Sequence, residues 1–193
     1  MRDSKQKFST ATVSLHWLVA VTIFAQWPLG YYMAKVRDYS LWPIHQSIGY
    51  LLFVAIAIRL IWRFRNGWPV PVNVYSRFER VLARTVHWTL VVALVVMPLS
   101  GIVSTYAGGY DITVFGVTLI PDVPNHAIVA ANAIHKLKVT PRSEALHDFL
   151  QQVHILFAWI LAAAVALHVG GALKHHLVDR DGTLRRMLGA RVT

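Results

Sequence analysis

Residues 151–171 read QQVHILFAWILAAAVALHVGG, an apolar stretch with one histidine near each end. His154 and His168 are fourteen residues apart, which is about 3.9 turns of an α-helix, or about 21 Å along its axis. The two rings therefore share one face of the helix. An ionisable side chain inside an apolar span indicates a functional site, because lipid does not solvate it. We interpret both histidines as ligands whose partners lie on the other helices.

The chain has the composition of a membrane protein. Of its 193 residues, 55% are hydrophobic, which makes the chain too apolar for an ordinary soluble domain. The chain is also too short for more than one helical bundle. Cysteine is absent. This excludes disulfides, cysteine-ligated zinc, iron–sulfur clusters and covalently attached haem, since each needs a thiol. The charged N-terminus and the long apolar run behind it predict a transmembrane helix rather than a cleaved signal peptide.

Hydropathy predicts four membrane-spanning helices in a single domain over residues 1–193. We place them at about 13–33, 42–62, 81–105 and 151–174, with a long outer loop at about 106–146. Pro28 and Gly30 interrupt the first of these helices. Thr140 and Pro141 predict that the fourth helix starts before its membrane span, and residues 125–138 are a short helical candidate. Short links join antiparallel neighbours, so the predicted fold is an all-α, up-down four-helix bundle.

The basic residues are distributed unevenly between the two sides of this bundle. Thirteen lysines and arginines lie in the N-terminal arm, the second loop and the tail, and five lie on the opposite side. The positive-inside rule therefore places both termini in the cytoplasm and the long loop outside. Orientation alone accounts for the net charge of +10, so nucleic acid is not implied.

The predicted depths of four histidines match in pairs. His16 lies in the first turns of the first helix, near the cytoplasmic side, and His168 lies at the same level on the fourth helix. His45 and His154 both lie near the outer side. Facing helices of a bundle hold b-type haem in this way, with one imidazole on either side of the iron. We therefore predict two b-type haems, an inner one held by His16 and His168 and an outer one held by His45 and His154.

Three further residues are candidates for the site, each with an alternative. Arg59 lies fourteen residues after His45 and would contact a haem propionate, or it extends to the cytoplasmic headgroups. His87 either lines a quinone pocket or hydrogen-bonds between helices. His175 either binds a quinone carbonyl or is solvated at headgroup depth. The sequence assigns no catalytic residue.

Other residues are weaker candidates. His147 precedes His154 by seven residues and competes with it as a ligand, but only His154 has a partner at its own depth. We expect His126 and His135 to be solvated loop residues. Several glycines either make room for a flat macrocycle or allow close helix packing; these are Gly49, Gly101, Gly170 and Gly171.

Several motifs resemble the bacterial cytochrome b561 family. They are SLHWLV at 14–19, IHQSIG at 44–49 followed by Arg59 and Leu60, the fourteen-residue step to His168, ALKHH at 172–176 and DGTLRRM at 181–187. The resemblance covers nearly the whole chain. It implies a four-helix, dihaem protein of the bacterial inner membrane with the same two histidine pairs. It also implies electron exchange with ubiquinone and, as an activity attributed to the family, superoxide oxidation at the outer face.

Three functions compete at this stage. The first is an oxidoreductase of the superoxide:ubiquinone type. The second is an electron-transfer subunit whose loop at about 121–146, longer than in compact family members, docks a periplasmic redox protein. The third is a haem-free transporter that uses its histidines as a proton relay. The implied partners are the lipid bilayer, ubiquinone, and either superoxide or a redox protein, and the sequence leaves open whether the chain forms a homodimer.

Overall fold

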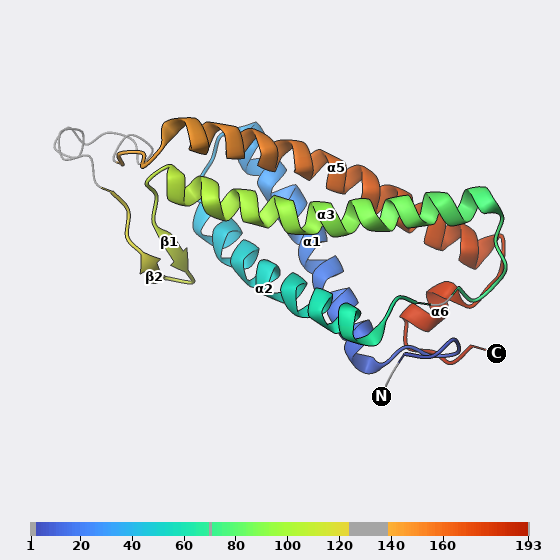
Figure 1. The fold of residues 1–193 in the computed structure, drawn as a ribbon. Helices are drawn as coiled ribbons and strands as arrows, with labels where there is room; N and C mark the ends of the chain where they lie inside the picture. Colours follow the sequence, from blue (N-terminus) through green and yellow to red (C-terminus); the bar gives the residue numbers. More distant parts are fainter. Residues whose placement is uncertain (1–2, 70, 124–138, 193) are drawn as a thin grey trace. The chain divides into compact units, whose positions relative to one another are not determined.

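The computed structural model describes residues 3–69, 71–123 and 139–192, and most of them are helical (Figure 1). The long helices are α1 (Thr10–Val36), α2 (Trp42–Asn66), α3 (Arg77–Ala107) and α5 (Glu144–Leu177). A short helix α6 (Thr183–Met187) and the strands β1 (Ile112–Val114) and β2 (Val117–Ile120) complete the described part. The four long helices are long and apolar enough to cross a membrane, so the prediction of four spans is confirmed.

The four helices extend beyond the predicted spans at nearly every end. Hydropathy detects only the part that contacts lipid, whereas a helix continues through polar turns until a cap or a turn residue stops it. The fourth helix begins at Glu144, so the predicted start at Thr140 and Pro141 is wrong by about one turn. Pro28 lies inside α1, which continues to Val36, so the predicted interruption is also wrong. The helical candidate at 125–138 lies outside the described residues.

Side chains cap two of the helices at their N-termini. At α3, Ser76 Oγ accepts the backbone N–H of Glu79, and Glu79 Oε2 accepts the backbone N–H of Ser76. This reciprocal pair is a capping box, which satisfies two backbone donors that have no partner within the helix. At α1, Ser9 Oγ accepts the N–H of Thr12 at 3.3 Å. Both caps explain why these helices start before the apolar residues begin.

The chain forms two compact units, and each of the four long helices contributes to both. Unit 1 comprises Met1–Phe24, Val54–Leu94 and Ile160–Thr193, and unit 2 comprises Ala25–Phe53 and Val95–Trp159. In unit 1, the N-terminal arm lies beside the C-terminal tail (Figure 1). The backbone N–H of Val192 bonds Gln6 O at 2.9 Å, and Arg186 donates to Lys5 O at 2.8 Å. Both ends of the chain are thus held against the same unit.

Unit 2 has polar side chains in its interior and carries a β-hairpin. Strands β1 and β2 pair antiparallel, and Phe115 and Gly116 form the turn with positive φ angles of 45° and 86°. The hairpin is fixed to α2, since Ser47 Oγ accepts the N–H of Phe115 at 2.9 Å and Gln46 Nε2 donates to Asp111 O at 2.7 Å. The fully or nearly buried polar residues of this unit are Gln26, Gln46, Ser47, Ser100, Ser104 and Thr105.

Large apolar side chains remain exposed along the long helices. Val21 of α1, Val54 of α2 and Trp159 of α5 are more than half exposed. Such surfaces are unfavourable in water but suit lipid, and a helix satisfies its own backbone groups there. The exposed residues therefore agree with helices that face a bilayer.

Candidate haem sites

Two histidines of unit 2 face one another. His45 lies near the start of α2 and His154 lies in α5. Their ring centres are 6.4 Å apart, and the ring planes cross at 80°. The structure thus brings together the pair that was predicted from matching depths.

A glycine of another helix lies against each of these rings. A Cβ atom on Gly30 of α1 would lie 3.2 Å from His45 Cε1, and one on Gly101 of α3 would lie 3.0 Å from His154 Cε1. Such distances are shorter than almost all real contacts of a Cβ atom, so a side chain at either position would press on the imidazole. Because neither glycine has a side chain, the two imidazole rings fit in the positions that they occupy. Sequence analysis noted Gly101 but assigned no function to Gly30.

The hydrogen bonds of His154 define its tautomer. Its Nδ1 lies 2.7 Å from the backbone oxygen of Met97, and a carbonyl oxygen only accepts hydrogen bonds. Nδ1 therefore carries the proton, and in a neutral ring Nε2 is left with a lone pair. This is the form in which imidazole binds a metal. The sequence offered no signal for this contact, since the acceptor is a backbone atom.

Unit 1 contains the second predicted pair. His16 of α1 and His168 of α5 have ring centres 6.2 Å apart and planes at 57°. His87 of α3 is a third histidine in this group, and its ring centre is 5.1 Å from that of His168. The Nδ1 of His87 bonds Ala83 O at 2.7 Å within its own helix.

The separation of the rings tests whether haem iron fits between them. A metal–nitrogen bond to imidazole is about 2.0–2.1 Å long and the nitrogen lies roughly 1.1 Å from the ring centre, so two rings on opposite sides of one metal have centres roughly 6.3 Å apart. The pairs His16–His168 and His45–His154, at 6.2 and 6.4 Å, agree with this value. His87 and His168, at 5.1 Å, are too close. The ring spacing therefore fits iron at both predicted pairs.

Arg59 contacts one of these rings. Its guanidinium Nη2 lies 2.9 Å from His16 Nδ1. Since arginine only donates, Nδ1 accepts and the ring proton is on Nε2. This contact excludes ligation through Nε2 in the same state, because a ring that binds a metal through Nε2 keeps its proton on Nδ1. Arg59 is therefore placed beside the predicted inner ligand.

His147 does not reach the unit 2 pair. Its Nδ1 lies 2.8 Å from Ser104 O, and its ring lies 5.9 Å from that of Tyr110. The hydrogen bond to Ser104 O therefore accounts for Nδ1 without a metal. His126 and His135 lie outside the described residues.

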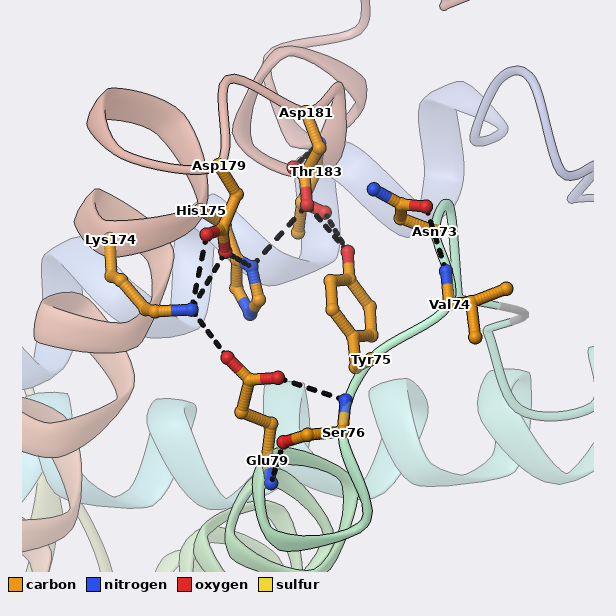
Figure 2. Close-up of polar contacts among 10 residues, drawn as sticks. All are labelled: Asn73, Val74, Tyr75, Ser76, Glu79, Lys174, His175, Asp179, Asp181 and Thr183. Atoms are coloured by element: carbon orange, nitrogen blue, oxygen red, sulfur yellow. Dashed lines mark hydrogen bonds and ion pairs between the residues drawn. The ribbon is translucent and has the colours of Figure 1, made fainter.

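His175 belongs to a polar cluster at the end of α5 in unit 1, shown in Figure 2. Its Nδ1 lies 2.7 Å from Asp179 Oδ2 and 3.3 Å from Asp181 Oδ2. Lys174 bonds Asp179, and the Tyr75 hydroxyl donates to Asp181 at 2.5 Å. The second ring nitrogen of His175 points away from both carboxylates (Figure 2). Nδ1 therefore lies at ion-pair distance from both carboxylates without a hydrogen bond to a described residue, and the other ring nitrogen is directed elsewhere.

The same cluster offers the ligand types of a divalent cation. The ligand atoms of His175, Asp179 and Asp181 all lie within 4.8 Å of one another. The ammonium of Lys174 and the hydroxyl of Tyr75 already satisfy the two carboxylates. We therefore interpret the cluster as an ion-pair network.

This network predicts a pH-dependent attachment of α6. Burial alone would raise the pKa of Asp181, but hydrogen bonds from Tyr75 and Thr183 and the charge of His175 bring this pKa below its ordinary value. The carboxylate therefore stabilises the fold above the unfolded pKa of about 3.9, and this contribution is lost as the pH falls through the lower folded pKa.

We expect Asp181→Asn to release α6 at neutral pH. A hydrogen bond to a charged group contributes about 1.5–3 kcal/mol, and each 1.4 kcal/mol changes an equilibrium about tenfold. Limited trypsin digestion should therefore cleave after Arg185 at least about tenfold faster than in the wild type. Asp179→Asn is the control, because Asp179 pairs with Lys174 and His175 and is more exposed than Asp181, at 23% against 4%. Exposed ion pairs contribute little, whereas Asp181 accepts the N–H of Thr183 at the start of α6. Equal cleavage of Asp181→Asn and wild type would contradict this prediction.

Membrane-spanning helices that bring histidines together at the spacing of bis-imidazole iron define a class of protein, the membrane cytochromes of b type. Covalent haem attachment is excluded because the chain has no cysteine. Residues 7–190 match the prokaryotic cytochrome b561 family, and the chain belongs to this family.

Two relatives match along almost their whole length. Cytochrome b561 homolog 2 of Escherichia coli (strain K12) is 31% identical over 192 residues, which cover 97% of this chain and 94% of the relative. The probable superoxide oxidase CybB of Yersinia pestis is 27% identical over 190 residues, which cover 95% of this chain and 96% of the relative. The resemblance seen in the sequence motifs is thereby confirmed.

Membership of the family settles the general class of function. The chain is a multi-pass membrane protein that uses b-type haem and transfers electrons. A haem-free transporter finds no support in this family. The number of haems, their ligands and the electron donor and acceptor are finer points that the family alone leaves open.

Proposed function

We propose that the chain is a dihaem cytochrome that carries electrons across the bacterial inner membrane to ubiquinone. His16 and His168 hold the inner haem, and His45 and His154 hold the outer haem. Both termini lie in the cytoplasm, as the excess of basic residues in the arm, second loop and tail favours. The observation that carries this proposal is the pair of ring separations, 6.2 and 6.4 Å, since both agree with the roughly 6.3 Å expected for one iron between two imidazoles.

Superoxide is the proposed donor at the outer face. A similar protein of Yersinia pestis is named a probable superoxide oxidase. Two superoxide anions lose one electron each and become two molecules of oxygen, and ubiquinone takes up these two electrons with two protons and becomes ubiquinol. Bound haem supplies the one-electron chemistry between them. The chain contributes the ligands, the separation of the two reactions by the bilayer, and the groups that deliver protons to the quinone.

His175, with His87 as a second candidate, is proposed to bind the quinone. The Nδ1 of His175 lies within ion-pair distance of Asp179 and Asp181, and the doubly protonated ring would donate from Nε2 to a quinone carbonyl. His87 is exposed, and its Nδ1 is bonded to Ala83, so its Nε2 is left to interact with a ligand.

Two measurements test this function. The reduced-minus-oxidised spectrum with haem quantification should give two low-spin b haems per chain. Stopped-flow mixing with superoxide and a soluble ubiquinone should show superoxide decay above the uncatalysed rate, and His175→Leu should raise the KM for quinone without loss of haem. Superoxide decay at the uncatalysed rate would exclude superoxide as donor, and one haem per chain would contradict the dihaem assignment.

Arg59 is proposed to bind a propionate of the inner haem. Once His16 ligates iron through Nε2, its Nδ1 becomes a donor and Arg59 loses its acceptor. A guanidinium in an apolar span needs an anion, and a propionate is the one that haem brings.

We expect Arg59→Met to lower the midpoint potential of the inner haem and to weaken its retention, because a positive charge near haem favours the reduced state. Redox titration of Arg59→Met and Arg59→Lys measures this, and the lysine variant should stay close to the wild type. Arg63→Met is the matched control, because Arg63 bonds Asp3 and Gly67 O instead of a candidate ligand. An unchanged potential in Arg59→Met would contradict the propionate role.

A second candidate function is docking of a periplasmic redox protein. The hairpin β1–β2 favours it, since Phe115, Val117 and Leu119 are each 63% exposed and charged residues are absent from 112–120. A Val117→Ser, Leu119→Ser double variant discriminates between the two functions. Slower reduction by a periplasmic extract with unchanged superoxide kinetics would support docking, and unchanged rates with both donors would contradict it.

A further inference from the structure

The two proposed ligands of the outer haem differ in how their second ring nitrogen is held. His154 Nδ1 bonds the backbone oxygen of Met97 at 2.7 Å. His45 Nδ1 is buried and has no hydrogen-bond partner among the residues that the structure describes. A histidine that binds a metal almost always donates its other ring N–H to a carbonyl, a carboxylate or water, which fixes its tautomer and orientation. The partner of His45 is therefore missing.

Gln26 of α1 is the side chain that already holds His45 by another atom. Gln26 is 5% exposed, and its Nε2 donates to the backbone oxygen of His45 at 2.8 Å. The assignment of nitrogen and oxygen follows from this bond, since a carbonyl oxygen only accepts. The other amide atom, Gln26 Oε1, is buried and lacks a partner within the described part of the chain.

One buried donor and one buried acceptor are thus left unpaired on two residues that are already bonded to each other. Leaving both unpaired is costly, because each loses its water and gains nothing in return. Two glycines lie close to these groups. A Cβ on Gly49 would lie 3.6 Å from Gln26 Nε2, and one on Gly30, one turn after Gln26, would press on the His45 ring. Larger residues at these positions would restrict both groups.

We propose that Gln26 is the positioning residue of His45. Its Nε2 holds the backbone of the ligand, and its Oε1 accepts the Nδ1–H of the imidazole when Nε2 binds iron. This inference rests on the proposed ligation by His45. It gives the outer haem one ligand held by a backbone carbonyl, through Met97, and one held by a side-chain amide, through Gln26.

The proposal predicts the direction in which the midpoint potential of the outer haem shifts. An acceptor on Nδ1–H increases the electron donation of the ring and favours ferric iron, so it lowers the midpoint potential. Gln26→Leu removes the acceptor and should raise this potential. Gln26→Glu supplies a stronger acceptor and should lower it. A role of Gln26 in packing alone predicts no such opposite shifts.

Redox titration of the purified protein, followed at the absorption band of each haem, tests this directly. The outer haem is identified as the one lost in His45→Ala. Thr22→Val is the matched control, because Thr22 lies four residues earlier on α1 and, within the described part of the chain, its hydroxyl bonds only its own helix, at Leu18 O. We expect shifts of opposite sign in the two Gln26 variants at the outer haem, with the inner haem and Thr22→Val unchanged.

The outcomes separate this inference from the function it rests on. If His45→Ala retains both haems, the ligand assignment fails and the role of Gln26 fails with it. If His45→Ala loses one haem but Gln26→Leu leaves the potential of that haem unchanged, the inference alone is overturned. Shifts of the same sign in Gln26→Leu and Gln26→Glu would also overturn it, since they indicate an altered pocket rather than a hydrogen bond.

Discussion

We expect His154→Ala to reduce the haem content of the purified protein from about two to about one per chain, and His45→Ala to remove the same haem. His16→Ala and His168→Ala should each remove the other haem. The chain has no cysteine, so b-type haem is retained only by its axial bonds and its pocket. Loss of one of the two imidazoles should therefore release the haem that they hold.

The reduced-minus-oxidised spectrum and haem quantification after extraction measure this effect. His147→Ala is the control for His154→Ala, because His147 lies on the same helix and is bonded to Ser104 O. His87→Ala is the control for His168→Ala, because its ring packs against that of His168 at 5.1 Å. Both controls should retain two low-spin haems.

A different pattern would identify the error in the ligand assignment. If His147→Ala loses a haem and His154→Ala does not, the outer ligand lies about two turns nearer the N-terminus of α5 than proposed. If His87→Ala loses the inner haem and His16→Ala does not, the third histidine of unit 1 is the ligand. In either case the ring separations would have to change when haem binds, since they favour the proposed pairs in this structure.

The spans and the histidine pairs could be predicted because both depend on position along a helix. Apolar runs of about 20 residues are long enough to cross a bilayer, and residue number along antiparallel helices gives relative depth. This reasoning paired His16 with His168 and His45 with His154, as the structure does. It could not give helix ends such as Glu144, because capping and tertiary contacts set them.

The residues around the rings could not be predicted in the same way. Depth does not determine which side chains face one another across helices, so the contacts of Gly30, Gln26 and Met97 became visible only in the structure. The hairpin was missed for another reason. Residues 112–120 contain β-branched residues on both sides of Phe115 and Gly116, which is a hairpin signal, but the segment was treated only as part of a long loop.

Gly101→Leu is expected to remove the outer haem although it leaves every proposed ligand in place. A Cβ on residue 101 would lie 3.0 Å from His154 Cε1 and 3.1 Å from Nδ1, and the rest of a leucine side chain extends further towards the ring. The ring would have to move, and the bond from Nδ1 to Met97 O at 2.7 Å would break. Haem content should fall from about two to about one per chain.

A size series at this position separates displacement of the ring from damage to the helix. Gly101→Ala needs a shift of only a few tenths of an ångström, so we expect two haems with an altered outer-haem spectrum. Ala57→Leu places a leucine at an exposed position of α2 and should change neither haem. Two haems with unaltered spectra in Gly101→Leu would contradict the prediction, because the imidazole would then tolerate a side chain in contact with it.

Helix stability cannot explain the loss of haem in Gly101→Leu. Leucine is favoured over glycine inside a helix by roughly 0.5–1 kcal/mol, so α3 itself should become more stable. A variant with a more stable helix and one haem fewer therefore isolates the steric role of the glycine. It would show that the outer site depends on the empty space beside His154 as well as on the ligand itself.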